Sequence, residues 1–211
     1  MKRSTLNNII GLELFKVATS LNKKDWILLK NGERAPVFLD TAKFISYPQL
    51  QKQISTLIFK IIKDNNIKFD KILGVPYGGL SFAYNLSAEK SIPCLAIRKE
   101  GIKKYSTSGE ILGVYKNKEK VLVIEDATVT AKTVANFVKK IRKNNLVVSD
   151  VITILDVGGL AKNNLKKNKI NLHALFTWSE IYNSYKKKNI SSMSKDVVNF
   201  LDNFLLENIK Q

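Results

Sequence analysis

The chain has 211 residues, of which 45% are hydrophobic and 25% charged, a composition that suits one globular domain and excludes a mainly disordered, collagen-like or disulfide-stapled chain. No apolar run approaches the roughly 18 to 20 residues of a membrane span, the first residues lack a secretory signal, and Cys94 is the single cysteine, so we expect a cytoplasmic protein without membrane contact. The net charge is +17, but 31 of the 35 cations are lysines rather than the arginines that nucleic-acid recognition favours. We therefore interpret the charge as a lysine-rich surface and consider a nucleic-acid partner unlikely.

The first strongly periodic segment covers residues 47–66. Its leucines and isoleucines recur at the helical spacing, and Pro48 stands where the first turn of a helix tolerates proline. The apolar residues 71–75 predict a short strand. The turn sequence Pro76-Tyr77-Gly78-Gly79 follows and leads into a helix predicted from residue 80 to about residue 89.

The rest of the chain continues this alternation of strands and helices. Further strands are predicted at residues 93–97, 121–124, 147–155 and 170–176, and further helices at about residues 134–144 and 194–209. The strands have almost no polar face, which is typical of parallel strands buried on both sides. We therefore expect an α/β fold with an open parallel sheet flanked by helices. Its ligands should bind in one crevice beyond the carboxyl ends of the strands.

Two adjacent acids, Glu125 and Asp126, follow the strand at residues 121–124 and open a polar segment that we predict to be a loop as far as residue 132. Such acids are costly beside apolar residues unless cations or hydroxyls meet them. The next residues are Ala127, Thr128, Val129, Thr130, Ala131, Lys132 and Thr133. Their hydroxyls and backbone N–H groups precede a helix, a pattern that binds phosphate. A sugar phosphate fits, with its diol on the acids; the alternative is a turn in which Asp126 or Thr130 only caps the helix.

This acid pair and its loop resemble the signature of the type I phosphoribosyltransferases, in which an apolar strand leads to two acids and a loop rich in Thr, Ser and Gly. Other blocks of the chain resemble blocks of that family in the same order, most closely those of its orotate-using members. The blocks are residues 26–32, 35–40 and 74–80, Arg98-Lys99-Glu100 with Lys103 and Tyr105, and Leu155-Asp156. Several blocks in order are more specific than any one of them.

The resemblance implies a layout and a reaction. Residues 1–45 would form a small hood region over the base, residues 46–190 the sheet core, and residues 191–211 a C-terminal helix, all in one domain. In this family 5-phosphoribosyl-1-diphosphate, bound with Mg²⁺, gives its phosphoribosyl group to a base. With orotate the products are orotidine 5′-monophosphate and diphosphate, a step of pyrimidine biosynthesis. The family resemblance also implies a homodimer in which a mobile loop reaches into the neighbouring subunit.

The same resemblance assigns roles to individual residues. Lys103 would be the catalytic lysine, together with the acids Glu125 and Asp126. The other substrate-binding residues would be Lys30, Tyr77 and Gly78 at the donor or diphosphate, Arg98, Lys99 and Tyr105 in the loop over diphosphate, and Phe38 and Leu39 at the base. The glycines and serines of residues 99–113 predict a mobile segment, which could exclude water when it closes. Without the flanking blocks, the favoured interpretation of Lys103 would be one more exposed lysine among 31. No metal site made by the protein alone is expected.

Three positions depart from the family pattern. Val129 stands where the family has a Thr or Ser that contacts the base, and Ala131 replaces a loop glycine, which is tolerated only if φ need not be positive there. Val157 stands where the family usually has an Arg that binds the orotate carboxylate, an interaction worth about 1.5 to 3 kcal/mol. Two alternatives therefore stay open. One is a phosphoribosyltransferase for another base, and the other is a non-catalytic relative that senses the donor and binds nucleic acid.

Overall fold

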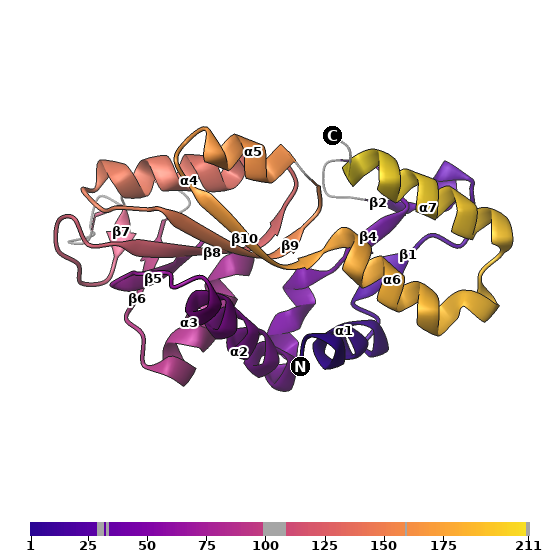
Figure 1. Ribbon diagram of the computed structural model, residues 1–211, viewed down its shortest axis with the longest axis horizontal. Helices are drawn as coiled ribbons and strands as arrows, with labels where there is room; N and C mark the ends of the chain where they lie inside the picture. The colour runs from indigo at the N-terminus through magenta and orange to yellow at the C-terminus, as the bar shows by residue number, and fades with distance from the viewer. Residues whose placement is uncertain (29–31, 33, 99–108, 159, 210–211) are drawn as a thin grey trace.

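A computed structural model describes residues 1–28, 32, 34–98, 109–158 and 160–209. Its centre is a sheet with the strand order β10-β9-β8-β5-β6-β7 (Figure 1). The strands are β5 (Lys71–Gly74), β6 (Cys94–Ile97), β7 (Ile111–Leu112), β8 (Val121–Thr128), β9 (Asp150–Asp156) and β10 (Asn171–Thr177). All neighbours pair in parallel except the short edge strand β7, which is antiparallel to β6. The predicted open parallel α/β sheet is confirmed.

Helices cover both faces of this sheet. The helices α2 (Pro48–Asp64) and α3 (Gly78–Lys90) lie on one face, and α4 (Lys132–Lys143) and α5 (Leu160–Lys166) on the other (Figure 1). Side chains of β8 alternate between the two layers, as strand geometry requires. Leu122 and Ile124 pack into the core under α2 and α3, whereas Val121 and Val123 pack into the core under α4 and α5. Both faces are apolar because both are buried.

The N-terminal and C-terminal segments of the chain lie together beside the sheet, at the right of Figure 1. The N-terminal elements are α1 (Lys2–Gly11), β1 (Phe15–Val17), η1 (Lys23–Asp25), β2 (Ile27–Leu28), β3 (Arg34–Ala35), β4 (Val37–Leu39) and η2 (Thr41–Ser46), and the C-terminal ones are α6 (Trp178–Asn189), η3 (Ile190–Ser192) and α7 (Lys195–Ile209). Phe15 packs edge-on against Trp178 with ring centroids 5.5 Å apart, and Trp26 lies 5.4 Å from Phe200. The predicted C-terminal helix therefore packs on the hood region.

Two boundaries near the predicted crevice differ from expectation. The predicted loop at residues 125–132 is wrong in its first half, because β8 continues as a strand to Thr128. The last residues of β8 pair with β9, where Glu125 lies opposite Thr153 and Thr128 lies opposite Asp156. The ladder therefore satisfies backbone groups that a loop would have left without strand partners. The strand predicted at residues 147–155 begins only at Asp150, since Val147 makes a single isolated bridge to Lys120.

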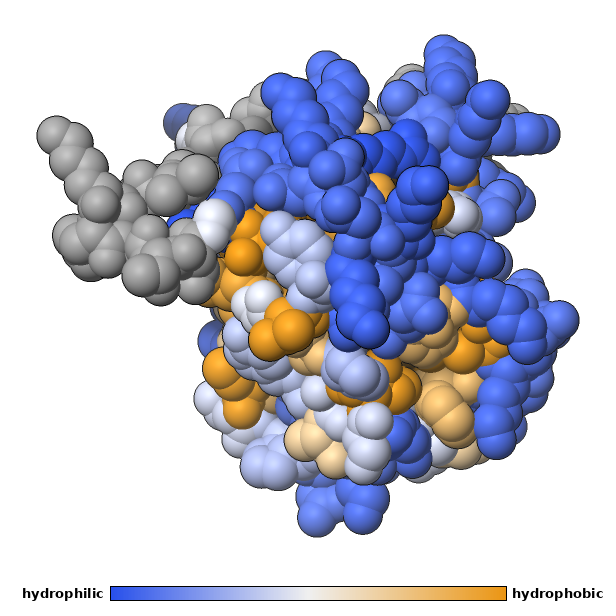
Figure 2. Space-filling model, turned by 90° about the vertical axis from the view of Figure 1, so that its left-hand side faces the viewer, coloured by the Kyte–Doolittle hydropathy of each residue, from blue (hydrophilic) through white to orange (hydrophobic). Residues whose placement is uncertain are grey.

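Hydrophilic and hydrophobic residues gather on different parts of the surface. In the view of Figure 2 the upper part of the molecule, over α4, is hydrophilic, and hydrophobic residues gather lower down. The outer side of α4 carries Lys139 and Lys143, both exposed. In the part of the chain that the structure describes, no helix combines the length and the apolar character needed to cross a membrane.

Candidate active site

The end of β8 sends its two acids to opposite faces of the sheet. Leu122 and Ile124 face α2 and α3, so the alternation of the strand places Asp126 on that same side and Glu125 on the side of α4. The contacts of the two side chains agree with this assignment. Asp126 contacts η2, whereas Glu125 lines a cavity in front of α4. The two acids therefore face different sides of the sheet, although they are neighbours in the strand.

Asp126 is partly exposed and accepts two hydrogen bonds. The Thr41 hydroxyl donates to Oδ2 over 2.7 Å, and the backbone N–H of Ala127 donates to Oδ1 over 2.9 Å. On another side the carboxylate lies against Gly78, the first residue of α3, where an added Cβ would overlap it. Gly78 is therefore needed for the close approach of α3 to the acid.

Glu125 is only 5% exposed, and its side chain behaves differently. Burial, reinforced by the side chain of Asp126 and its negative charge, raises the pKa of Glu125 to about 9, although the backbone N–H of Asp126 acts in the opposite direction. Its Oε1 accepts the backbone N–H of Asp126 over 3.0 Å. At neutral pH Glu125 is therefore protonated, and Asp126 is the acid of the pair that is open to a ligand.

A cavity of about 160 Å³ lies between the end of β8 and the start of α4. It is lined by Glu125, Ala127, Thr128, Val129, Thr130, Ala131, Lys132, Thr133 and Val134. Threonine hydroxyls, backbone N–H groups and the N-terminus of α4 meet there, which is the environment that binds a phosphate. The predicted loop residues are thus brought together around one cavity.

Ala131 adopts a left-handed backbone conformation, which its residue type makes unexpected. It is the N-cap of α4 and has φ 57° and ψ 18°, in the left-handed region. The expectation that alanine would stand here only without a positive φ is wrong. The residue is 5% exposed and packs in the core under α4, so burial of its methyl group offsets part of the strain.

Comparison with known proteins identifies the family of this chain. A model of the phosphoribosyl transferase domain matches residues 44–185. The chain belongs to the phosphoribosyltransferase family. It is similar to the orotate phosphoribosyltransferases of Caenorhabditis elegans (32% identical, covering 76% of this chain and 70% of the relative) and of Methanocaldococcus jannaschii (32%, covering 73% and 85%). The solved structure of Leishmania donovani UMP synthase shares the fold, with a TM-score of 0.78 and 24% identity over 96% of this chain and 42% of that longer one.

Four predicted site residues of this phosphoribosyltransferase, Lys30, Lys99, Lys103 and Tyr105, lie outside the described residues. Arg98, the last described residue before that segment, directs its Nε to the carbonyl oxygen of Gly109 over 3.4 Å.

On the expected base side, Phe38 is half-buried in β4, but Leu39 is 5% exposed and belongs to the core. A base could meet the backbone of Leu39 and not its side chain. Tyr77, which precedes Gly78, is 73% exposed beside the start of α3. Val129 is 58% exposed at the rim of the phosphate cavity, and Val157 is half-buried against the larger core. Neither valine supplies a charge to a bound carboxylate.

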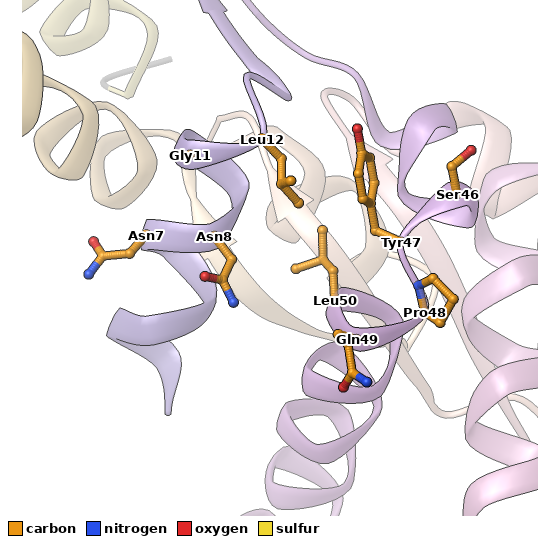
Figure 3. Close-up of a pocket in the computed structure, with 9 residues that line it drawn as sticks. All are labelled: Asn7, Asn8, Gly11, Leu12, Ser46, Tyr47, Pro48, Gln49 and Leu50. Carbon is orange, nitrogen blue, oxygen red and sulfur yellow. The ribbon is translucent and has the colours of Figure 1, made fainter.

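A further hollow of about 390 Å³ lies between α1 and the start of α2 (Figure 3). Leu12, Tyr47 and Leu50 point toward one another there, and the amides of Asn8 and Gln49 stand near its rim. None of the described residues that line it is charged, so it lacks the cations that a diphosphate needs.

Thr41 was not predicted as a site residue. It lies 85 residues from Asp126 in the sequence, just after the block at residues 35–40 and not in it, so only the fold reveals the contact.

Proposed function

We propose that this phosphoribosyltransferase is an orotate phosphoribosyltransferase of pyrimidine biosynthesis, a pentosyltransferase that acts in the cytoplasm. The observation that carries the proposal is the end of β8, where an acid open to solvent and a phosphate-sized cavity lie within a few residues of each other. Such a site fits a ribose 5-phosphate, with the phosphate before α4 and the hydroxyls at Asp126. Relatives at 32% identity that are orotate phosphoribosyltransferases support orotate as the base.

In the proposed reaction a ring nitrogen of orotate forms a bond to the anomeric carbon of the donor and loses its proton to the departing diphosphate. The bond from that carbon to diphosphate breaks, and diphosphate leaves with the electron pair. Asp126 orients the ribose through its hydroxyls, and the segment from Thr128 at the end of β8 to Thr133 in the first turn of α4 holds the 5-phosphate. Arg98, Lys99 and Lys103, assigned by the family resemblance, stabilise the charge that grows on diphosphate.

Magnesium enters this proposal with the donor. In the part of the chain described by the structure, no cluster of three or more His, Cys, Asp or Glu could hold a metal ion. Mg²⁺ suits such a site because it keeps several waters and binds through substrate phosphates with one or two carboxylates. The ion would neutralise part of the diphosphate charge.

The test is turnover by the purified protein with labelled 5-phosphoribosyl-1-diphosphate, Mg²⁺ and a panel of bases. We expect orotidine 5′-monophosphate from orotate. Asp126→Asn should lower donor binding or turnover about tenfold or more at an unchanged Tm, because a neutral amide makes weaker hydrogen bonds to the ribose hydroxyls. Unchanged kinetics of this variant would contradict the role given to Asp126.

A second candidate base is favoured by a specific observation. Val129 and Val157 bring neither a hydroxyl nor a cation to the base side, although orotate carries a carboxylate. Turnover of a base without a carboxylate, combined with none of orotate, would establish a phosphoribosyltransferase for that base and leave the donor site as described.

A homodimer with a shared loop is also part of the proposal. Ile45 on η2 and Tyr84 on α3 are 68% and 51% exposed, so apolar side chains are available on these elements for a subunit interface. If Lys103 acts across the interface, mixing Lys103→Ala chains with Asp126→Asn chains restores activity, because one mixed site keeps both residues. A verified mixed dimer without any activity would contradict the shared loop.

A further inference from the structure

One hydrogen bond ties the hood region to the acid that faces the proposed ribose site. Thr41 stands at the start of η2, directly after the segment that contains β4, and its Oγ1 donates to Oδ2 of Asp126 over 2.7 Å. A hydrogen bond to a charged carboxylate is stronger than a hydrogen bond between two neutral groups. This contact therefore constrains the Asp126 side chain more than an ordinary surface hydrogen bond would.

The backbone that carries Thr41 is held on both sides. The N–H of Asp40 donates to the carbonyl oxygen of Leu14 over 2.9 Å. Three residues after Thr41, Phe44 is fully buried and packs edge-on against Phe82 of α3, with ring centroids 6.0 Å apart. The Thr41 hydroxyl is thus fixed relative to α3, and it does not depend on a flexible loop for its position.

The remaining acceptor capacity of Asp126 matches a diol. A carboxylate has about four acceptor positions, two on each oxygen. The Ala127 N–H occupies one position on Oδ1 and Thr41 one on Oδ2, which leaves one position on each oxygen. Gly78 closes off one side of the carboxylate. Two neighbouring hydroxyls of a ribose could occupy the two remaining positions together.

We propose that Thr41 is a positioning residue for the proposed reaction. Its hydroxyl holds the Asp126 carboxylate in the one orientation that leaves an acceptor position on each oxygen for the ribose hydroxyls of the donor. This inference rests on the proposed function, since it requires a ribose at Asp126. It concerns the ribose part of the donor and not its diphosphate.

The test compares Thr41→Val, which keeps the shape and removes the hydroxyl, with Thr41→Ser, which keeps the hydroxyl. Thr56→Val is the matched control, because Thr56 on α2 bonds only to the carbonyl oxygen of Lys52 in its own helix. Thr41 is itself half-exposed, so the substitutions should be accepted by the fold, and the Tm of each variant checks this. Calorimetry measures binding of 5-phosphoribosyl-1-diphosphate and of inorganic diphosphate, each with Mg²⁺.

We expect Thr41→Val to weaken binding of the donor about 10- to 100-fold, the range for a hydrogen bond to a charged group. Binding of diphosphate should stay unchanged, and Thr41→Ser should remain within about threefold of the natural protein. Adding Thr41→Val to Asp126→Asn should weaken donor binding by much less than it does alone, because the two residues act as a unit.

Three results would overturn the inference. They are unchanged donor binding in Thr41→Val, an equal loss for the donor and for diphosphate, or a loss in Thr41→Ser as large as in Thr41→Val. The last two would mean that Thr41 only joins the hood region to the sheet. Failure of the natural protein to bind the donor at all would overturn the proposed function and, with it, this inference. Donor binding by the natural protein combined with any of the three results above would overturn this inference alone.

Discussion

Replacing Glu125 by Gln should change how the stability of the protein depends on pH. The pKa of Glu125 is raised by burial to about 9 in the folded chain, against 4.5 for an ordinary glutamate. Between these values the folded state holds one proton that the unfolded state has lost. The contribution of this proton to the free energy of unfolding is therefore fully present below about pH 4.5. It is lost progressively as the pH rises toward 9.

The size of the effect follows from the proton balance. One proton corresponds to about 1.4 kcal/mol per pH unit, so this residue lowers the free energy of unfolding by as much as about 2.7 kcal/mol between pH 6 and pH 8. For a domain of this length each kcal/mol moves the Tm by roughly 2 to 4 °C, which predicts a difference of about 5 to 11 °C. Gln cannot ionise, so Glu125→Gln should lack this part of the pH dependence.

The assay is thermal unfolding of the ligand-free protein from pH 5 to pH 9. Other titrating groups are the same in both proteins, so the informative quantity is the Tm of Glu125→Gln minus that of the natural protein, which should increase with pH. Glu89→Gln on α3 is the matched control for the same chemical change, because Glu89 is half-exposed, and the two Glu→Gln differences are compared at each pH. Parallel curves for Glu125→Gln and the natural protein would refute the protonated state of Glu125.

Three further substitutions test other parts of the site. Ala131→Gly should raise stability by about 0.5 to 1 kcal/mol, because it removes the left-handed strain at φ 57° at some cost in chain entropy; a lower Tm would show that the buried methyl group matters more. Gly78→Ala should weaken donor binding about tenfold or more, because the added Cβ overlaps the Asp126 carboxylate. The control Gly11→Ala, whose Cβ meets only Lys188 Nζ at 3.7 Å, should not weaken it, and equal binding by both variants would contradict the close approach of Gly78 to Asp126. Val157→Arg should strengthen orotate binding by up to about 1.5 to 3 kcal/mol, and no gain would mean that another residue holds the orotate carboxylate.

The fold could be predicted where local pattern and burial agree. The helical spacing of Leu50, Ile54 and Ile58 predicted α2, and the three side chains are buried as that spacing requires. The helix α1 was missed because its buried residues, among them Leu6 and Ile9, are few and interrupted by polar ones. What buries that helix is the other end of the chain and α2, which no local pattern reveals.

Long-range pairing also explains what could be predicted of the candidate site. The acids and the phosphate loop are contiguous in sequence, so their position at the end of a strand was predictable. Whether Glu125 belonged to the strand depended on β9, a partner about 25 residues away, and the pairing of Glu125 with Thr153 decided it. The contact from Thr41 to Asp126 joins residues 85 positions apart and had no signal in the sequence.

The order of the two acids along β8 carries information that their composition does not. Exchanging them, to give Asp at 125 and Glu at 126, would keep the charge and the residue content of the strand. It would nevertheless place the longer side chain against Thr41 and Gly78, where the present carboxylate is already in contact, and would leave the buried side one methylene short. The side of β8 that faces Thr41 and Gly78 therefore suits the shorter aspartate, and the buried side in front of α4 suits the longer, protonated glutamate.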